Sequence, residues 1–231
     1  MPSNDPFYIL GDSHVTAFLM GVRKADGKQL LRGGGWGNGK RFFDQFFEIE
    51  DNGRIEIFAD RTHYRKWVQQ AGRDLNDCQG RVIVSMGTSA TSLFNSPMWQ
   101  IFGPGRTPIS QDLFDTILDD MLVHVLDFYR ALKERGLIAA AYMAPPPQRT
   151  HPAFRRLGEK FVWDLIRQYQ APVLALLKEE NIPLIELPVA DADGYLLPKY
   201  AGPDEAHANP WIGEHAVKAL RELAEELAVP A

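Results

Sequence analysis

A serine near the start of the chain and an acid–histidine pair near its end have the residue types and spacing that nucleophilic catalysis requires. Ser13 follows an apolar segment that ends at Gly11, and Asp204 precedes His207 by three positions. A serine nucleophile needs a general base to take its proton and a carboxylate to fix the tautomer of that base. In Asp204-x-x-His207 the carboxylate can reach one imidazole nitrogen while the other nitrogen faces Ser13. We therefore predict Ser13 as nucleophile, His207 as base and Asp204 as the acid that holds the base.

Short apolar segments alternate with helical segments along the chain, and these elements must bring the three residues together. Strands are predicted near 7–10, 29–32, 81–86, 137–143 and 183–187, and helices over 111–135, over 154–180 and after Asn209-Pro210. This alternation predicts an α/β fold, a three-layer α/β/α sandwich around a flavodoxin-like parallel sheet of about five strands. Ligands bind such a sheet outside the carboxyl ends of its strands, where Ser13, Ser89 and the segment 204–207 all fall.

Two further segments complete the predicted organisation. The segments 47–50 and 54–58 alternate with period two on either side of Asp51-Asn52-Gly53, which predicts a small β-hairpin inserted before the next helix. Apolar residues at helical spacing run from Tyr64 to Cys78, so Cys78 is expected on a buried helix face. We find no linker and no repeat, and we expect residues 1–231 to form one domain.

Composition and charge narrow the class of protein. The chain has 231 residues, 45% hydrophobic and 24% charged, as in globular proteins. Its formal charge of -5 is not gathered into blocks, which argues against nucleic-acid binding. No apolar run approaches the roughly 20 residues of a membrane span, and the N-terminus lacks the basic region of a signal peptide. With one cysteine and no zinc-type Cys/His spacing, we expect a cytoplasmic protein without cofactor or metal.

Rival interpretations of the same residues are weaker. Gly34 and Gly39-Lys40 match most of a phosphate-binding loop, but Arg41 stands where that loop needs Ser or Thr to bind magnesium. A metal site formed by His14, Asp204 and His207 has no sign of the outer residues that orient such ligands.

The three segments resemble sequence blocks of the SGNH (GDSL-type) hydrolase family. Gly11-Asp12-Ser13 resembles the first block, whose serine is the nucleophile and whose amide helps to bind the oxyanion. The segment 32–37 resembles the second block, in which a glycine amide is a further donor, and Gly37 aligns best with that glycine. The segment 204–213 resembles the last block, which carries the acid and the base. The resemblance spans residues 7–216.

The third block of the family is where this sequence departs from the pattern. The family reads Gly-x-Asn-Asp, with the asparagine as an oxyanion donor, whereas here Gly87 is followed two positions later by Ser89. Ser89 is therefore the provisional third donor. The alternatives are Asn38, Asn95 or a hole made of two amides only.

Two residues beside the predicted nucleophile are given no chemical step. Asp12 is expected to hold the tight turn by accepting from local backbone amides. His14 is expected not to act as the base, because adjacent residues rarely point their side chains at one another.

The resemblance implies a serine esterase or acyl-ester hydrolase whose oxyanion hole is formed by Ser13, Gly37 and Ser89. We expect a small ester as substrate, with an acylated sugar among the candidates. A non-catalytic carbohydrate- or ligand-binding module and an acyltransferase of the same fold are the alternatives. The sequence does not indicate acyl-chain length or oligomeric state. The segment 94–108 is expected to be a lid or an interface, and the candidates to line a pocket are Trp36, Phe94, Trp99, Phe102, Arg149 and Tyr200.

Overall fold

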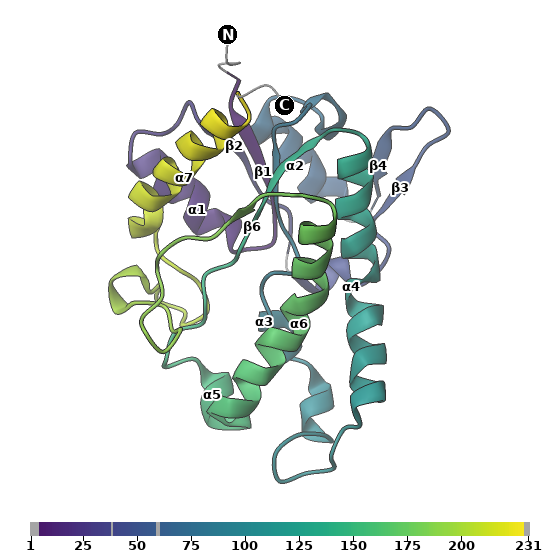
Figure 1. Cartoon of the computed structure of the whole chain (residues 1–231), viewed down its shortest axis with the longest axis vertical. Coiled ribbons are helices and arrows are strands. Elements are labelled where there is room, and N and C mark those ends of the chain that lie inside the picture. Colours follow the sequence, from purple (N-terminus) through teal and green to yellow (C-terminus); the bar gives the residue numbers. More distant parts are fainter. Residues whose placement is uncertain (1–4, 38, 59–60, 229–231) are drawn as a thin grey trace.

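The computed structural model describes residues 5–37, 39–58 and 61–228, and a five-stranded parallel sheet lies at its centre (Figure 1). The strand order is β2-β1-β5-β6-β7, so the first strand lies inside the sheet. This order and the parallel pairing confirm the predicted flavodoxin-like sheet. The strands span Phe7–Gly11 (β1), Leu31–Gly35 (β2), Val82–Ser85 (β5), Ile138–Tyr142 (β6) and Leu184–Ile185 (β7).

Helices cover both faces of the sheet, which gives the three layers that the alternation predicts. Helices α1 (Val15–Lys24) and α7 (Gly213–Glu226) pack on one face, where Phe7 and Ile9 of β1 point. Helices α2 (Arg61–Ala71), α4 (Gln111–Glu134) and α6 (Glu159–Glu179) pack on the other, where Tyr8 and Leu10 point. Because β1 is buried on both faces, its sequence is continuously apolar instead of alternating.

The predicted hairpin is also present. Strands β3 (Phe47–Ile49) and β4 (Ile55–Ile57) pair antiparallel and project at the upper right of Figure 1. The Arg135 guanidinium, which follows α4, donates to the Gly53 carbonyl at 2.7 Å and so ties the hairpin tip to the main body.

Three of the element boundaries that differ from the prediction do so at a glycine. The predicted helix over 154–180 is two helices, α5 (Pro152–Leu157) and α6, because Gly158 takes a φ of 86° between them. Helix α2 stops at Ala71, before Gly72 at φ 79°. Strand β2 extends into the glycine cluster. Glycine is needed there, because a Cβ at Gly33 would lie 2.3 Å from the Ile9 carbonyl oxygen of the paired strand.

The single cysteine is buried, as predicted, but not on the predicted helix. Cys78 follows a short 3-10 turn, η2 (Leu75–Asp77), and its thiol donates to the Asp74 carbonyl. Burial raises the pKa of Cys78 to about 12, so its reactive thiolate is scarce near neutral pH.

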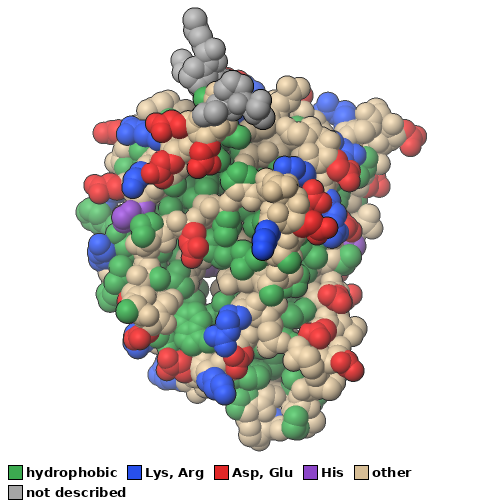
Figure 2. Space-filling view, in the orientation of Figure 1, with side chains coloured by type: hydrophobic (Ala, Val, Ile, Leu, Met, Phe, Trp, Pro, Cys, Tyr) green, Lys and Arg blue, Asp and Glu red, His purple; other side chains and the backbone are tan. Residues whose placement is uncertain are grey.

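The surface carries both signs of charge. Figure 2 shows acidic and basic side chains interspersed over one face of the molecule, with neither gathered into a single field. Among the described residues no helix is long and apolar enough to cross a membrane.

Candidate active site

Ser13 stands at the carboxyl end of β1, where its neighbours are buried and its own side chain is exposed. Asp12 and His14 are each 4% exposed. Asp12 Oδ1 accepts the backbone N–H of His14 at 2.9 Å, which closes the turn from β1 into α1 as predicted. The alternation of inward and outward side chains therefore presents the Ser13 hydroxyl at the edge of the sheet.

A loop near the C-terminus brings an acid and a histidine to the same edge. Ala201 and Ala208 form an isolated antiparallel bridge, and the loop between them turns on Asp204. Asp204 Oδ1 accepts the amides of Ala206, at 3.2 Å, and His207, at 3.0 Å. Asp204 Oδ2 lies 2.5 Å from His207 Nδ1. One carboxylate thus shapes the turn and holds the imidazole.

The structure joins these residues in one line of hydrogen bonds. Ser13 Oγ lies 2.6 Å from His207 Nε2, although the two residues are 194 positions apart in sequence. Partial burial works to raise the pKa of Asp204, but hydrogen bonds from the His207 ring and from two backbone amides outweigh it and hold that pKa below its ordinary value. The Asp204 carboxylate is therefore ionised near neutral pH.

Two backbone amides that follow the ends of β1 and β2, those of Ser13 and Gly37, have no acceptor in the part of the chain that the structure describes. The amide of Trp36 donates to the Gly11 carbonyl at 2.7 Å, which holds the segment after β2 against the end of β1. Within the described residues, neither the Ser13 amide nor the Gly37 amide donates to a protein acceptor. Unpaired amides at the edge of a site are the groups that stabilise an oxyanion.

Ser89 lies on the neighbouring loop, after β5, and it is held there by His14, to which the sequence analysis assigned no chemical step. Ser89 Oγ is 2.9 Å from His14 Nε2 and 3.0 Å from Thr91 Oγ1. The His14 ring also lies against the His207 ring, with centroids 4.6 Å apart. As expected, the His14 side chain does not turn toward Ser13. It contacts both Ser89 and His207, the predicted base.

The buried pair beside Ser13 has shifted proton affinities. Burial raises the pKa of Asp12, although the His14 ring and the His14 amide oppose it. Burial lowers the pKa of His14, although the Asp12 carboxylate opposes it. Both shifts favour the neutral forms of these two side chains.

Of the other two candidates for the third oxyanion donor, the structure describes only Asn95, and Asn95 is not brought into the site. Asn95 closes the short helix α3 (Thr91–Phe94), where its side chain is exposed and makes no hydrogen bond to the residues just described. Asn38 lies outside the described residues.

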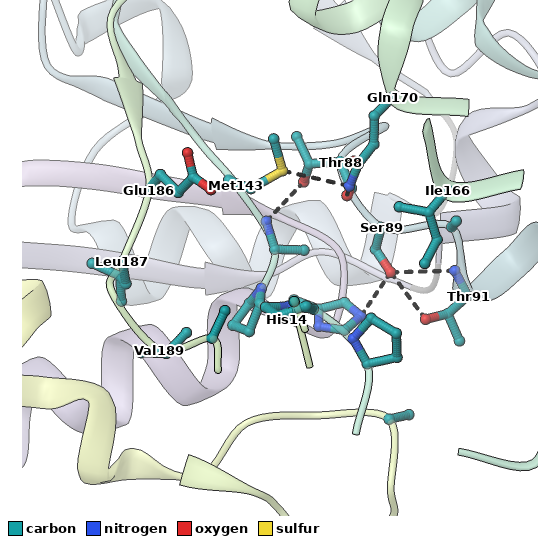
Figure 3. A pocket seen from close by; sticks show the side chains of 18 of the residues that line it. His14, Thr88, Ser89, Thr91, Met143, Ile166, Gln170, Glu186, Leu187 and Val189 are labelled. Carbon is teal, nitrogen blue, oxygen red and sulfur yellow. Dashed lines mark hydrogen bonds between the residues drawn. The ribbon is translucent and has the colours of Figure 1, made fainter. Parts of the chain in front are cut away.

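A cavity of about 240 Å³ opens beside Ser89 and His14 (Figure 3). Its walls are mainly apolar and come from α6 and from the segments that follow β6 and β7; Ile166, Leu187 and Val189 are among them. Gln170 closes part of it by donating to the Thr88 carbonyl at 2.6 Å. A mainly apolar cavity of this kind suits an organic group of modest size.

Of the six predicted pocket residues only Phe94 lines this cavity. Trp36 and Trp99 are buried in the core, and the Trp99 ring donates to the Leu93 carbonyl. The buried Tyr200 hydroxyl bonds His215, and Arg149 pairs on the surface with two aspartates. Phe102 is half-buried and bridges to Thr107. These residues were candidates either to line a pocket or to pack beneath the loops, and most of the aromatic ones pack in the core.

The five-stranded parallel sheet with helices on both faces is the fold of solved structures described as GDSL-type lipolytic proteins and acylhydrolases. The chain superposes on a GDSL-like lipase from Bacteroides thetaiotaomicron with a TM-score of 0.54 and 11% identity, over 97% of this chain and 89% of that one. A protein from Bacteroides fragilis assigned as an acylhydrolase gives 0.52 and 12% identity, over 96% and 88%. A protein of the G-D-S-L lipolytic family from Desulfitobacterium hafniense gives 0.51 and 13%, over 93% and 99%.

These likenesses establish the fold, as the sequence resemblance predicted. No family model matches the chain, and no curated protein matches its sequence. The predicted activity therefore has to be argued from the site itself.

Proposed function

We propose that the protein is a serine esterase that hydrolyses small esters, with Ser13 as nucleophile, His207 as general base and Asp204 as the orienting acid. The observation that carries the proposal is the continuous line of hydrogen bonds from the Ser13 hydroxyl through the His207 ring to the Asp204 carboxylate. A Ser–His–acid line with these distances performs acyl transfer on several unrelated folds.

The proposed reaction assigns each proton to a named atom. Ser13 Oγ attacks the ester carbonyl while His207 Nε2 takes the hydroxyl proton, and the Asp204 carboxylate stabilises the imidazolium that results. His207 then gives the proton to the leaving alcohol. Water, activated by the same imidazole, releases the acid and restores Ser13.

The oxyanion is proposed to bind to the backbone amides of Ser13 and Gly37, with the Ser89 hydroxyl as the third donor. All three groups follow the ends of neighbouring strands β1, β2 and β5. Donors fixed in advance at such a place stabilise the charge that develops on the carbonyl oxygen, because they need no reorganisation during the reaction.

The apolar cavity beside Ser89 supports an ester with an uncharged organic group of modest size. An acylated sugar remains among the candidate substrates. An acyltransferase would use the same acyl-enzyme with an alcohol in place of water. A binding module without activity is less well supported, because binding alone would not need the bonded Ser13–His207–Asp204 line.

The proposal is tested by the hydrolysis of p-nitrophenyl acetate. Wild type is expected to turn over this ester, and Ser13→Ala to lower kcat by at least about 10³-fold while keeping the thermal unfolding temperature. Ser110→Ala, at the N-cap of α4 and far from the site in sequence, is the matched control and should keep wild-type kcat. A Ser13→Ala variant that turns over like wild type would remove Ser13 from the mechanism.

A further inference from the structure

His14 is a buried imidazole to which the proposed reaction gives no step. Its Nε2 lies 2.9 Å from Ser89 Oγ, and its ring lies against that of His207. Burial lowers the pKa of His14, so the ring is neutral near neutral pH. A neutral imidazole carries one N–H, and the nitrogen that holds it decides what the ring does to Ser89.

The two ring nitrogens have different surroundings. In the part of the chain that the structure describes, His14 Nδ1 is buried without a hydrogen-bond partner. A proton on Nδ1 would be an orphaned buried donor, which folded proteins rarely keep, whereas an unused acceptor is tolerated somewhat more often. The proton therefore belongs on Nε2, facing Ser89 Oγ.

The tautomer of His14 then decides where the Ser89 proton points. A serine oxygen has two lone pairs and one proton. His14 Nε2–H and the Thr91 amide, 3.4 Å away, both point at Ser89 Oγ and occupy its lone pairs. The Ser89 proton is left to donate, at rest to Thr91 Oγ1 at 3.0 Å (Figure 3). With the opposite tautomer, Ser89 would instead donate to His14 and be withheld from a substrate.

We propose that His14 is a positioning residue that makes Ser89 an oxyanion donor, by donating from Nε2 to Ser89 Oγ and leaving the Ser89 proton free for the substrate. His14 directly follows Ser13, so one short segment carries the nucleophile and orients the donor on the next loop. The inference rests on the proposed esterase function. It gives the hydroxyl at position 89 a fixed direction, as a rigid side-chain amide would have.

Matched variants separate this role from packing. His14→Gln keeps an amide N–H at about the reach of Nε2, whereas His14→Phe keeps the ring and removes the donor. We expect His14→Phe to lower kcat for p-nitrophenyl acetate by about 10- to 100-fold with KM changed by less than about twofold, part of the cost of one lost oxyanion donor. His14→Gln should recover most of that kcat.

A double-mutant cycle tests whether His14 acts through Ser89. Ser89→Ala should lower kcat as much as His14→Phe or more, and the double variant should be no worse than Ser89→Ala alone, within about twofold. If His14→Phe lowers kcat by the same factor with and without Ser89, or leaves kcat unchanged in an active enzyme, the inference is overturned.

Ring ¹⁵N NMR of the folded wild-type protein gives a readout that does not depend on activity. The expected result is a neutral His14 with its proton on Nε2, and a proton on Nδ1 would overturn the inference even if His14→Phe failed to fold. A wild type that neither hydrolyses the ester nor reacts with a fluorophosphonate would overturn the proposed function and this inference with it. An active wild type with the wrong tautomer overturns the inference alone.

Discussion

At the scale of the residue, Asp204 combines two tasks in one carboxylate. Oδ1 closes the turn by accepting two amides, and Oδ2 accepts from the His207 ring. An asparagine can keep the turn, but an amide NH₂ facing Nδ1 would stabilise the wrong tautomer of the base. We expect Asp204→Asn to lower kcat by up to about 10⁴-fold with little loss of thermal stability.

The matched control for this variant is Glu205→Gln. It removes the same charge from the adjacent residue, whose side chain is not part of the hydrogen-bonded line. Steady-state kinetics on p-nitrophenyl acetate checks both variants. If Glu205→Gln lowered kcat relative to wild type as much as Asp204→Asn does, the Asp204 carboxylate would act only through its charge. That result would contradict the proposed orientation of the base.

Asp12 offers a second residue-scale prediction, on stability against pH. Burial raises its pKa in the folded protein above the ordinary value, so the native state holds this proton more tightly than the unfolded chain does. The contribution of Asp12 to the free energy of unfolding is therefore greatest below the ordinary aspartate range, and it falls as pH rises through the pKa of the folded state. Asp12→Asn removes this loss and keeps an acceptor for the His14 amide.

Urea unfolding at pH 4 and pH 7 measures the effect. The stability of Asp12→Asn relative to wild type should increase from pH 4 to pH 7. A relative stability that decreases over that interval would show that ionised Asp12 is stabilised in the fold by a partner.

The candidate triad residues were predictable because motif order and strand ends can be read from the sequence. Ser13, Asp204 and His207 were named from the sequence, and in the structure His207 lies within hydrogen-bond distance of both of the others. His14 was given no role, although the alternation of side chains beside an exposed Ser13 implies that it is buried. The sequence does not reveal which residue contacts the buried His14 ring. Ser89 is 75 positions away, and the contact depends on how β1 and β5 pair.

At the scale of the element, the packing of α1 on α7 depends on two glycines. A Cβ at Gly213 would lie 2.1 Å from the Gly21 carbonyl oxygen, while the φ of Gly213 is an ordinary helical -59°. Gly213→Ala is therefore expected to cost about 1–3 kcal/mol of stability through overpacking alone. Because α7 begins six positions after His207, activity should fall as well.

Urea unfolding and ester hydrolysis check this prediction together. Lys218→Ala, an exposed position on the same helix, is the control and should change stability by less than about 0.5 kcal/mol. An unchanged midpoint in Gly213→Ala would mean that the two helices can separate without loss.

Element boundaries were less predictable than element types. The apolar periodicity of 154–180 runs through Gly158 and does not reveal that this glycine separates two helices. The run of glycines after position 32 looked like a loop, yet part of it is strand, because close pairing with β1 excludes side chains there. In both cases the deciding contact is long-range or conformational.

At the scale of the whole molecule, the strands that make the sheet come from residues 7 to 185, and α7 packs back beside α1. The expectation of one domain over residues 1–231 implies one cooperative unfolding unit. Urea transitions followed by far-UV circular dichroism and by fluorescence of the five tryptophans should coincide. Two separated transitions would contradict the single domain.

The central claim, that Ser13 is an activated nucleophile, is tested most directly by reaction with a fluorophosphonate followed by peptide mass spectrometry. We expect one phosphonate on the peptide that contains Ser13 in wild type. Ser13→Ala should give no adduct, and His207→Ala should give a greatly slowed reaction, because the hydroxyl is nucleophilic only when the imidazole takes its proton. A wild-type protein that stays unmodified, or that carries the adduct on Ser89, would contradict the account.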